Sequence, residues 1–111
     1  MNQVIEHIPE PKNLLEIIKE RMSSKSKLII SFPNTKSFWC YISGKKWINW
    51  HVPYHLHHFD DNNFERMAKE CGFKIINKKT ITPNIWSIMQ IRALFKSEKI
   101  GEKSKLWNQS Y

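Results

Sequence analysis

Glycine, cysteine and long apolar runs are scarce in this sequence, and each scarcity excludes a class of protein. The chain has three glycines and two cysteines in 111 residues, and no G-x-G motif. Cys40 and Cys71 lie far apart without a C-x-x-C pattern, so we expect buried free thiols rather than a disulfide. No apolar run approaches the length of a membrane span, and the N-terminus shows no basic region followed by an apolar stretch. We therefore expect a cytoplasmic protein with no membrane span.

Negative charge is also in short supply, since eighteen Lys and Arg stand against ten Asp and Glu, which gives a formal net charge of +8. A basic stripe on one face would indicate a nucleic-acid partner. The lysines are instead scattered from Lys12 to Lys105 and form no stripe. We expect no nucleic-acid binding and interpret the surplus as solvated surface.

Apolar residues at helical spacing predict three helices. The first begins at Pro11, a residue that suits the first helical turn. The second covers Phe64–Cys71, with capping side chains in Asp60–Asn63 and a stop signal at Gly72. The third covers Ile85–Phe95. In each of these three segments, the apolar residues would lie on one face of the helix and pack against a core.

Two shorter segments are typical of strands. Lys27–Phe32 is an almost wholly apolar run, which predicts a strand buried on both faces, and Phe73–Thr82 predicts a second strand. Helices alternating with strands predict an α/β layered sheet. Two strands would leave unpaired edges, so we expect either a homo-oligomer formed through exposed sheet edges or a missing part of the sheet.

Several motifs resemble one enzyme family in the right order. Val4–Pro11 (VIEHIPEP) resembles the segment after the fourth strand of class I S-adenosylmethionine-dependent methyltransferases, especially the ubiquinone-biosynthesis O-methyltransferase group. Lys27–Asn34 (KLIISFPN) is similar to that family's fifth strand and P-N turn. The family's G-x-x-W, H-L-x-x-F and terminal G-F motifs are matched by Gly44–Trp47, His55–Phe59 and Gly72–Phe73.

The resemblance implies a fold and a cofactor. It implies a partial Rossmann-like methyltransferase sheet with flanking helices over residues 1–95, followed by a basic, partly ordered extension over 96–111. The family's glycine-rich loop and ribose-binding acidic residue have no counterpart here, so the chain resembles the C-terminal half of such an enzyme. S-adenosylmethionine would serve the full-length parent. We expect this fragment to bind it poorly and to be inactive alone.

Glu6 and His7 are the candidate catalytic residues. The resemblance places them at the carboxyl end of a strand, where open α/β sheets bind ligands, and His7 could take a proton near neutral pH. Alternatively, both residues shape the turn before Pro9. Some quinone methyltransferases bind a divalent cation through E-x-x-E-H, but the first position here is Gln3. We expect no metal, because one carboxylate of that hard-cation site is lost.

The stretch Trp50–Asp61 holds four of the five histidines but shows no spacing typical of a zinc site. We therefore expect no metal there either. The resemblance places His55 near the substrate mouth, where it forms a pocket wall or packs structurally. Aromatic rings supply flat apolar surface with polar tips, as ligand pockets require. The predicted substrate-binding residues are Asn34, Trp47, Trp50, Tyr54 and His55.

Two functional hypotheses follow. The first is the C-terminal part of a methyltransferase that transfers a methyl group to a small-molecule acceptor, on a hydroxyl. The second is a non-catalytic α/β interaction module, assembled as a homodimer whose basic surface meets an anionic partner.

Overall fold

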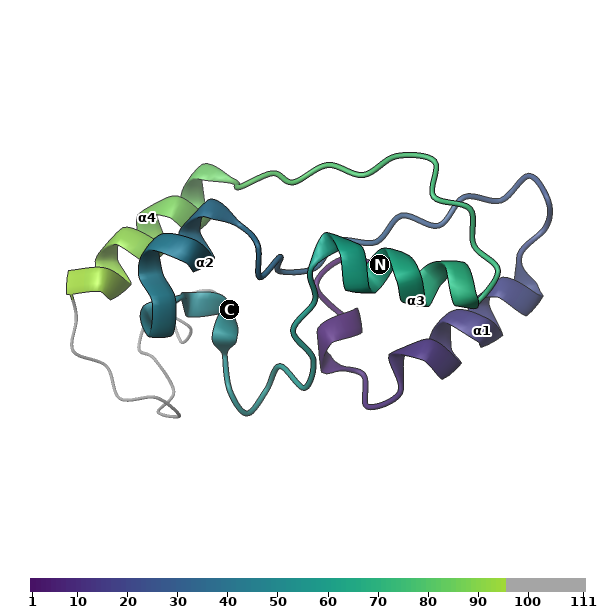
Figure 1. Ribbon diagram of the computed structural model, residues 1–111, viewed down its shortest axis with the longest axis horizontal. Helices are drawn as coiled ribbons and strands as arrows, with labels where there is room; N and C mark the ends of the chain where they lie inside the picture. The colour runs from purple at the N-terminus through teal and green to yellow at the C-terminus, as the bar shows by residue number, and fades with distance from the viewer. Residues whose placement is uncertain (96–111) are drawn as a thin grey trace.

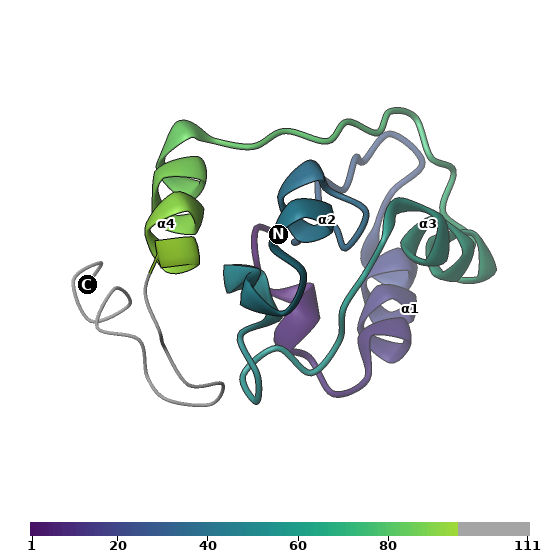
Figure 2. The same ribbon diagram turned by 60° about the vertical axis from the view of Figure 1, so that its left-hand side comes forward.

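The computed structural model describes residues 1–95, which form α-helices and short 3-10 helices joined by extended segments (Figure 1). The elements in chain order are η1 (Ile5–His7), α1 (Pro11–Arg21), α2 (Phe38–Ser43), η2 (Gly44–Lys46), η3 (Ile48–Trp50), α3 (Asp61–Glu70) and α4 (Asn84–Phe95). Helices α1 and α3 lie side by side at one end, and α2 and α4 lie at the other (Figures 1 and 2). The predicted extension over 96–111 lies outside the described residues.

The three predicted helices are confirmed, and their local signals act as expected. Helix α1 starts with Pro11 at its first position. The Asp60 carboxylate accepts hydrogen bonds from the backbone N–H groups of Asn62 and Asn63, and the Asn63 side-chain oxygen accepts one from the Asp60 backbone N–H. Gly72 follows α3 with φ +81°, a left-handed conformation that glycine adopts without steric cost.

The predicted sheet is wrong. Among residues 1–95 no strand forms, and the β-pairing consists of two isolated parallel bridges, Asn2 with Ser31 and Asn34 with Phe59. The α/β fold with a partial Rossmann-like methyltransferase sheet is therefore contradicted for this chain. A homo-oligomer through exposed sheet edges loses its structural premise with it.

The reason lies in pairing, because a strand exists only where a neighbour completes its ladder. The segment 27–32 has only residues 1–3 alongside, through Gln3 N–H to Ser31 O at 2.9 Å and Ser31 N–H to Met1 O at 3.0 Å. Burial on both faces is also wrong, since Ile29 is 80% exposed. The segment 73–82 runs extended between α3 and α4 without any bridge (Figure 1).

The core lies between η1, α1 and α3. Its buried residues are Ile5, Leu15, Phe59 and Cys71, and Leu28, Ile30, Phe32, Phe64 and Met67 are among the apolar side chains packed around them. Burying such a side chain stabilises the fold by about 1.5–3 kcal/mol. Cys40 and Cys71 are both buried free thiols, as predicted. Helices between residues 1 and 95 all fall short of the length and apolar character needed to cross a membrane.

Candidate functional site

The single turn η1 holds Glu6 and His7 at the edge of the core. Ile5 is fully buried in that core, the Glu6 side chain is 1% exposed, and His7 is exposed. The Glu6 carbonyl accepts backbone hydrogen bonds from Leu56 N–H at 2.8 Å and His57 N–H at 3.1 Å. These two bonds fasten the histidine-rich connection onto η1, although the two segments are about fifty residues apart in the chain.

His55 is thereby brought against His7. Their ring centroids lie 4.7 Å apart in an edge-to-face arrangement at 73°. His7 Nδ1 lies 2.8 Å from the Tyr54 carbonyl oxygen, and His55 Nδ1 lies 2.7 Å from the Asn49 carbonyl oxygen. One ligand-capable atom from each of Glu6, His7 and His55 falls within 4.8 Å of the others. We call these three residues the Glu6–His7–His55 cluster.

Burial sets the electrostatics of the cluster. It raises the pKa of the Glu6 carboxyl, an effect that a hydrogen bond from the backbone N–H of Glu6 itself and, less strongly, the charge of His7 partly oppose. It lowers the pKa of His55 to about 4, although the hydrogen bond to Asn49 acts in the opposite direction. His55 is therefore a neutral imidazole near pH 7. Within residues 1–95, neither carboxyl oxygen of Glu6 has a hydrogen-bond partner from another residue.

The predicted aromatic residues divide among different environments. The Tyr54 ring lies against His51, with centroids 4.9 Å apart, next to the cluster. Trp50 donates from Nε1 to the Gly44 carbonyl at 2.8 Å and meets Trp47 edge-to-face at 5.2 Å. Trp50 therefore packs the connection together, while Tyr54 sits beside the histidines.

A cavity of about 670 Å³ lies next to the cluster and not within it. Asn34 and Trp47 line it, whereas Trp50 and the three cluster residues are absent from its lining. The lining includes Asn2, Ser31, Trp39, Asn49, Thr80 and Gln90. The predicted site residues thus fall into two adjoining places. Asn49 connects the cavity with the cluster, because it lines the cavity and its backbone carbonyl oxygen accepts the hydrogen bond from His55.

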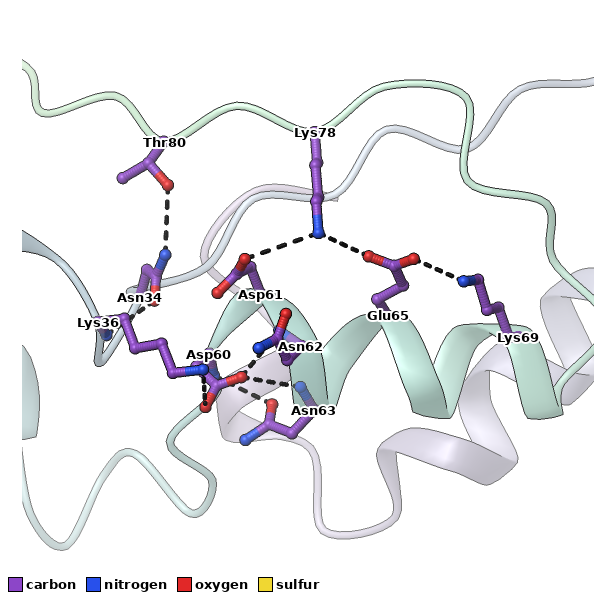
Figure 3. Close-up of polar contacts among 10 residues, drawn as sticks. All are labelled: Asn34, Lys36, Asp60, Asp61, Asn62, Asn63, Glu65, Lys69, Lys78 and Thr80. Atoms are coloured by element: carbon purple, nitrogen blue, oxygen red, sulfur yellow. Dashed lines mark hydrogen bonds and ion pairs between the residues drawn. The ribbon is translucent and has the colours of Figure 1, made fainter.

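One wall of the cavity is the extended segment 73–82, which polar side chains tie to the rest of the molecule (Figure 3). Asn34 Nδ2 donates to Thr80 Oγ1 at 3.2 Å. Lys78 Nζ lies 2.7 Å from a Glu65 carboxylate oxygen on α3 and 3.7 Å from Asp61. Hydrogen bonds from Lys69 and Lys78 lower the pKa of Glu65 to about 2.

The predicted site residues do not include Gln90, which the structure shows to hold the connection in place. Its side chain is 1% exposed on α4, with Oε1 accepting from Ile48 N–H at 2.9 Å and Nε2 donating to the Lys46 carbonyl at 3.0 Å. Gln90 therefore fixes η2 and η3 on α4. A lone amide inside the apolar run Ile85–Phe95 was the available signal, since a polar group buried there needs partners.

Comparison with known proteins gives one family. The family model described as a methyltransferase domain matches residues 1–78, which include the whole Glu6–His7–His55 cluster. No curated protein and no solved structure gave a match. Because the matched residues are well over half of the 111, the chain belongs to the methyltransferase domain family.

Proposed function

We propose that this chain is the acceptor-side part of an S-adenosylmethionine-dependent methyltransferase that acts on a hydroxyl of a small molecule. The observation that carries the proposal is the convergence of Glu6, His7 and His55 beside a cavity large enough for a small ligand. The family assignment supports a transferase, and the convergent polar groups support a site for an acceptor that must lose a proton.

His7 is the residue proposed to receive that proton. Its Nδ1 lies 2.8 Å from the Tyr54 carbonyl oxygen, so Nδ1 carries the hydrogen in the neutral ring and Nε2 holds the free lone pair. As the acceptor oxygen bonds to the methyl carbon, its hydrogen passes to His7 Nε2. The buried Glu6 carboxylate would stabilise the imidazolium that forms, because opposite charges close together favour each other's charged form.

The body of the acceptor is proposed to lie in the adjoining cavity. Trp47 offers a flat apolar surface there, and Asn34 offers an amide. Tyr54 and His55 would flank the reacting group on the cluster side, because the Tyr54 carbonyl contacts His7 and His55 contacts the carbonyl of Asn49, which lines the cavity. Trp50 would act indirectly, by holding Trp47 in place.

S-adenosylmethionine, which this family typically uses, supplies a methyl group on a positively charged sulfur. The described residues offer no glycine-rich cradle for it, since Gly44 and Gly72 are isolated in the chain. We therefore assign no residue of this chain to the cofactor. We propose that the residues that hold it lie outside these 111.

The test is methyl transfer by the natural full-length product of the reading frame. That protein would be incubated with isotopically labelled S-adenosylmethionine and a panel of small molecules that offer hydroxyl, amine or acidic carbon acceptors. We expect a labelled O-methyl product, identified from its carbon chemical shift. Transfer only to nitrogen or carbon would contradict the hydroxyl acceptor, and absence of transfer across all acceptor classes would contradict the proposed enzyme.

A further inference from the structure

The Glu6–His7–His55 cluster brings together atoms that all offer lone pairs. A carboxyl group and two imidazole rings contribute one such atom each, all within 4.8 Å of one another. Two of the three residues are nearly buried, with Glu6 1% and His55 8% exposed, while His7 is exposed to solvent. A carboxyl oxygen and two ring nitrogens held this close together can share one bound cation.

Both imidazole rings are already oriented for that purpose. A carbonyl oxygen can only accept, so the contacts of 2.8 Å from His7 Nδ1 to Tyr54 O and 2.7 Å from His55 Nδ1 to Asn49 O place the hydrogen on each Nδ1. The lone pair of each neutral ring is then on Nε2. Histidines that bind metals typically donate their other ring N–H to a backbone carbonyl or carboxylate in this manner.

The Glu6 carboxylate supplies an independent observation. Both of its oxygens are buried, and among the described residues no other residue gives them a hydrogen bond. A buried carboxylate without partners is costly, and buried charges are normally paired or bound to metal ions. None of the ion pairs among the described residues involves Glu6, so a bound cation would satisfy its buried oxygens.

We infer that Glu6, His7 and His55 form a binding site for one divalent transition-metal ion of the zinc class. Two imidazole nitrogens and one carboxylate oxygen suit such ions, whereas Mg²⁺ prefers oxygen ligands throughout. Zinc–ligand bonds are about 2.0–2.2 Å, so the ligand atoms must draw together on binding. His7 is exposed, so its side would be the one from which solvent reaches the bound ion.

The three proposed ligands differ from those of the E-x-x-E-H pattern. The E-x-x-E-H pattern needs two carboxylates, and Gln3 stands in the place of one. His55 is 49 positions beyond Glu6 in the chain and reaches it only through the fold. The inference goes beyond the proposed function, because a metal ion and a proton would compete for the same Nε2 of His7. A binding assay can therefore succeed or fail independently of methyl transfer.

The experiment is a calorimetric titration of the full 111-residue chain, free of any affinity tag, with Zn²⁺. We expect one ion per chain, and Co²⁺ should give the visible absorption bands of a low-coordinate nitrogen and oxygen site. His7→Ala and Glu6→Gln should each weaken Zn²⁺ binding by on the order of tenfold or more. His57→Ala is the matched control, because His57 contacts the Pro9 carbonyl and lies outside the cluster.

Three results would overturn the inference. They are absence of Zn²⁺ binding, equal weakening by His57→Ala and His7→Ala, or displacement of Zn²⁺ by Mg²⁺ at similar concentration. His7 is exposed, so His7→Ala should keep the metal-free fold, which far-UV circular dichroism checks. If Glu6→Gln unfolds the chain, the comparison of His7→Ala with His57→Ala still decides.

Discussion

Replacing Gln90 by leucine should loosen the cavity wall, because one side chain satisfies two backbone groups of the connection. The substitution removes the acceptor for Ile48 N–H and the donor to the Lys46 carbonyl. Each lost hydrogen bond costs roughly 1 kcal/mol, and more where the abandoned group is cut off from water. Ile48 is only partly buried, so we expect a total loss of about 2 kcal/mol in the free energy of unfolding.

Urea denaturation monitored by circular dichroism would measure this loss. Arg92→Leu is the control, since Arg92 is exposed on the same helix and also becomes leucine. Leucine, arginine and glutamine have similar helix propensities, so helix propensity should not separate the two variants. Hydrogen exchange at the Ile48 amide should accelerate only in Gln90→Leu. Equal stability of the two variants, with Ile48 still protected, would refute the reasoning.

Further predictions concern the core, a helix cap and acid stability. Leu15→Ala should lower the free energy of unfolding by about 2–5 kcal/mol in urea titrations, while Ile17→Ala, at a position 41% exposed, should cost far less. Asp60→Ala should cost about 1 kcal/mol, and Asp60→Ser should recover most of it in thermal melts. The pKa of Glu65 is lowered from 4.5 to about 2 by Lys69 and Lys78, so its pairing with these two lysines stabilises the fold above about pH 4.5 and is lost as pH falls toward 2. Glu65→Gln should flatten that part of the stability–pH curve, and an unchanged slope would count against the pairing.

The helices could be predicted because their signals are local. Pro11 at the first position of α1, Asp60 as the cap of α3 and Gly72 after it each act within one turn of chain. The strands could not be predicted from local signals, because an apolar run such as residues 27–32 forms a β-ladder only beside a neighbouring strand of matching length. Residues 1–3 supply a single bridge there. The apolar pattern of this segment alone therefore does not show whether it joins a sheet.

The candidate site was predicted only in part for the same reason. Glu6 and His7 are adjacent in sequence and were found through the family resemblance. The approach of His55 depends on two backbone bonds from the Glu6 carbonyl to residues 56 and 57, which no spacing reveals. The role of Gln90 depends on the packing of α4 against η3, which the sequence pattern does not reveal. Contacts between distant segments carry the information that single-sequence patterns lack.

The most direct test of the central claim compares the turnover of His7→Ala with that of His57→Ala in the full-length methyltransferase. Metal chelator would be present, and the affinity for S-adenosylmethionine would be measured separately. If the Glu6–His7–His55 cluster receives the acceptor proton, His7→Ala should lower turnover by roughly 10²–10⁴-fold and leave cofactor affinity nearly unchanged. His57→Ala should match the natural protein. Undiminished turnover in His7→Ala would contradict the account and leave His7 with a structural role.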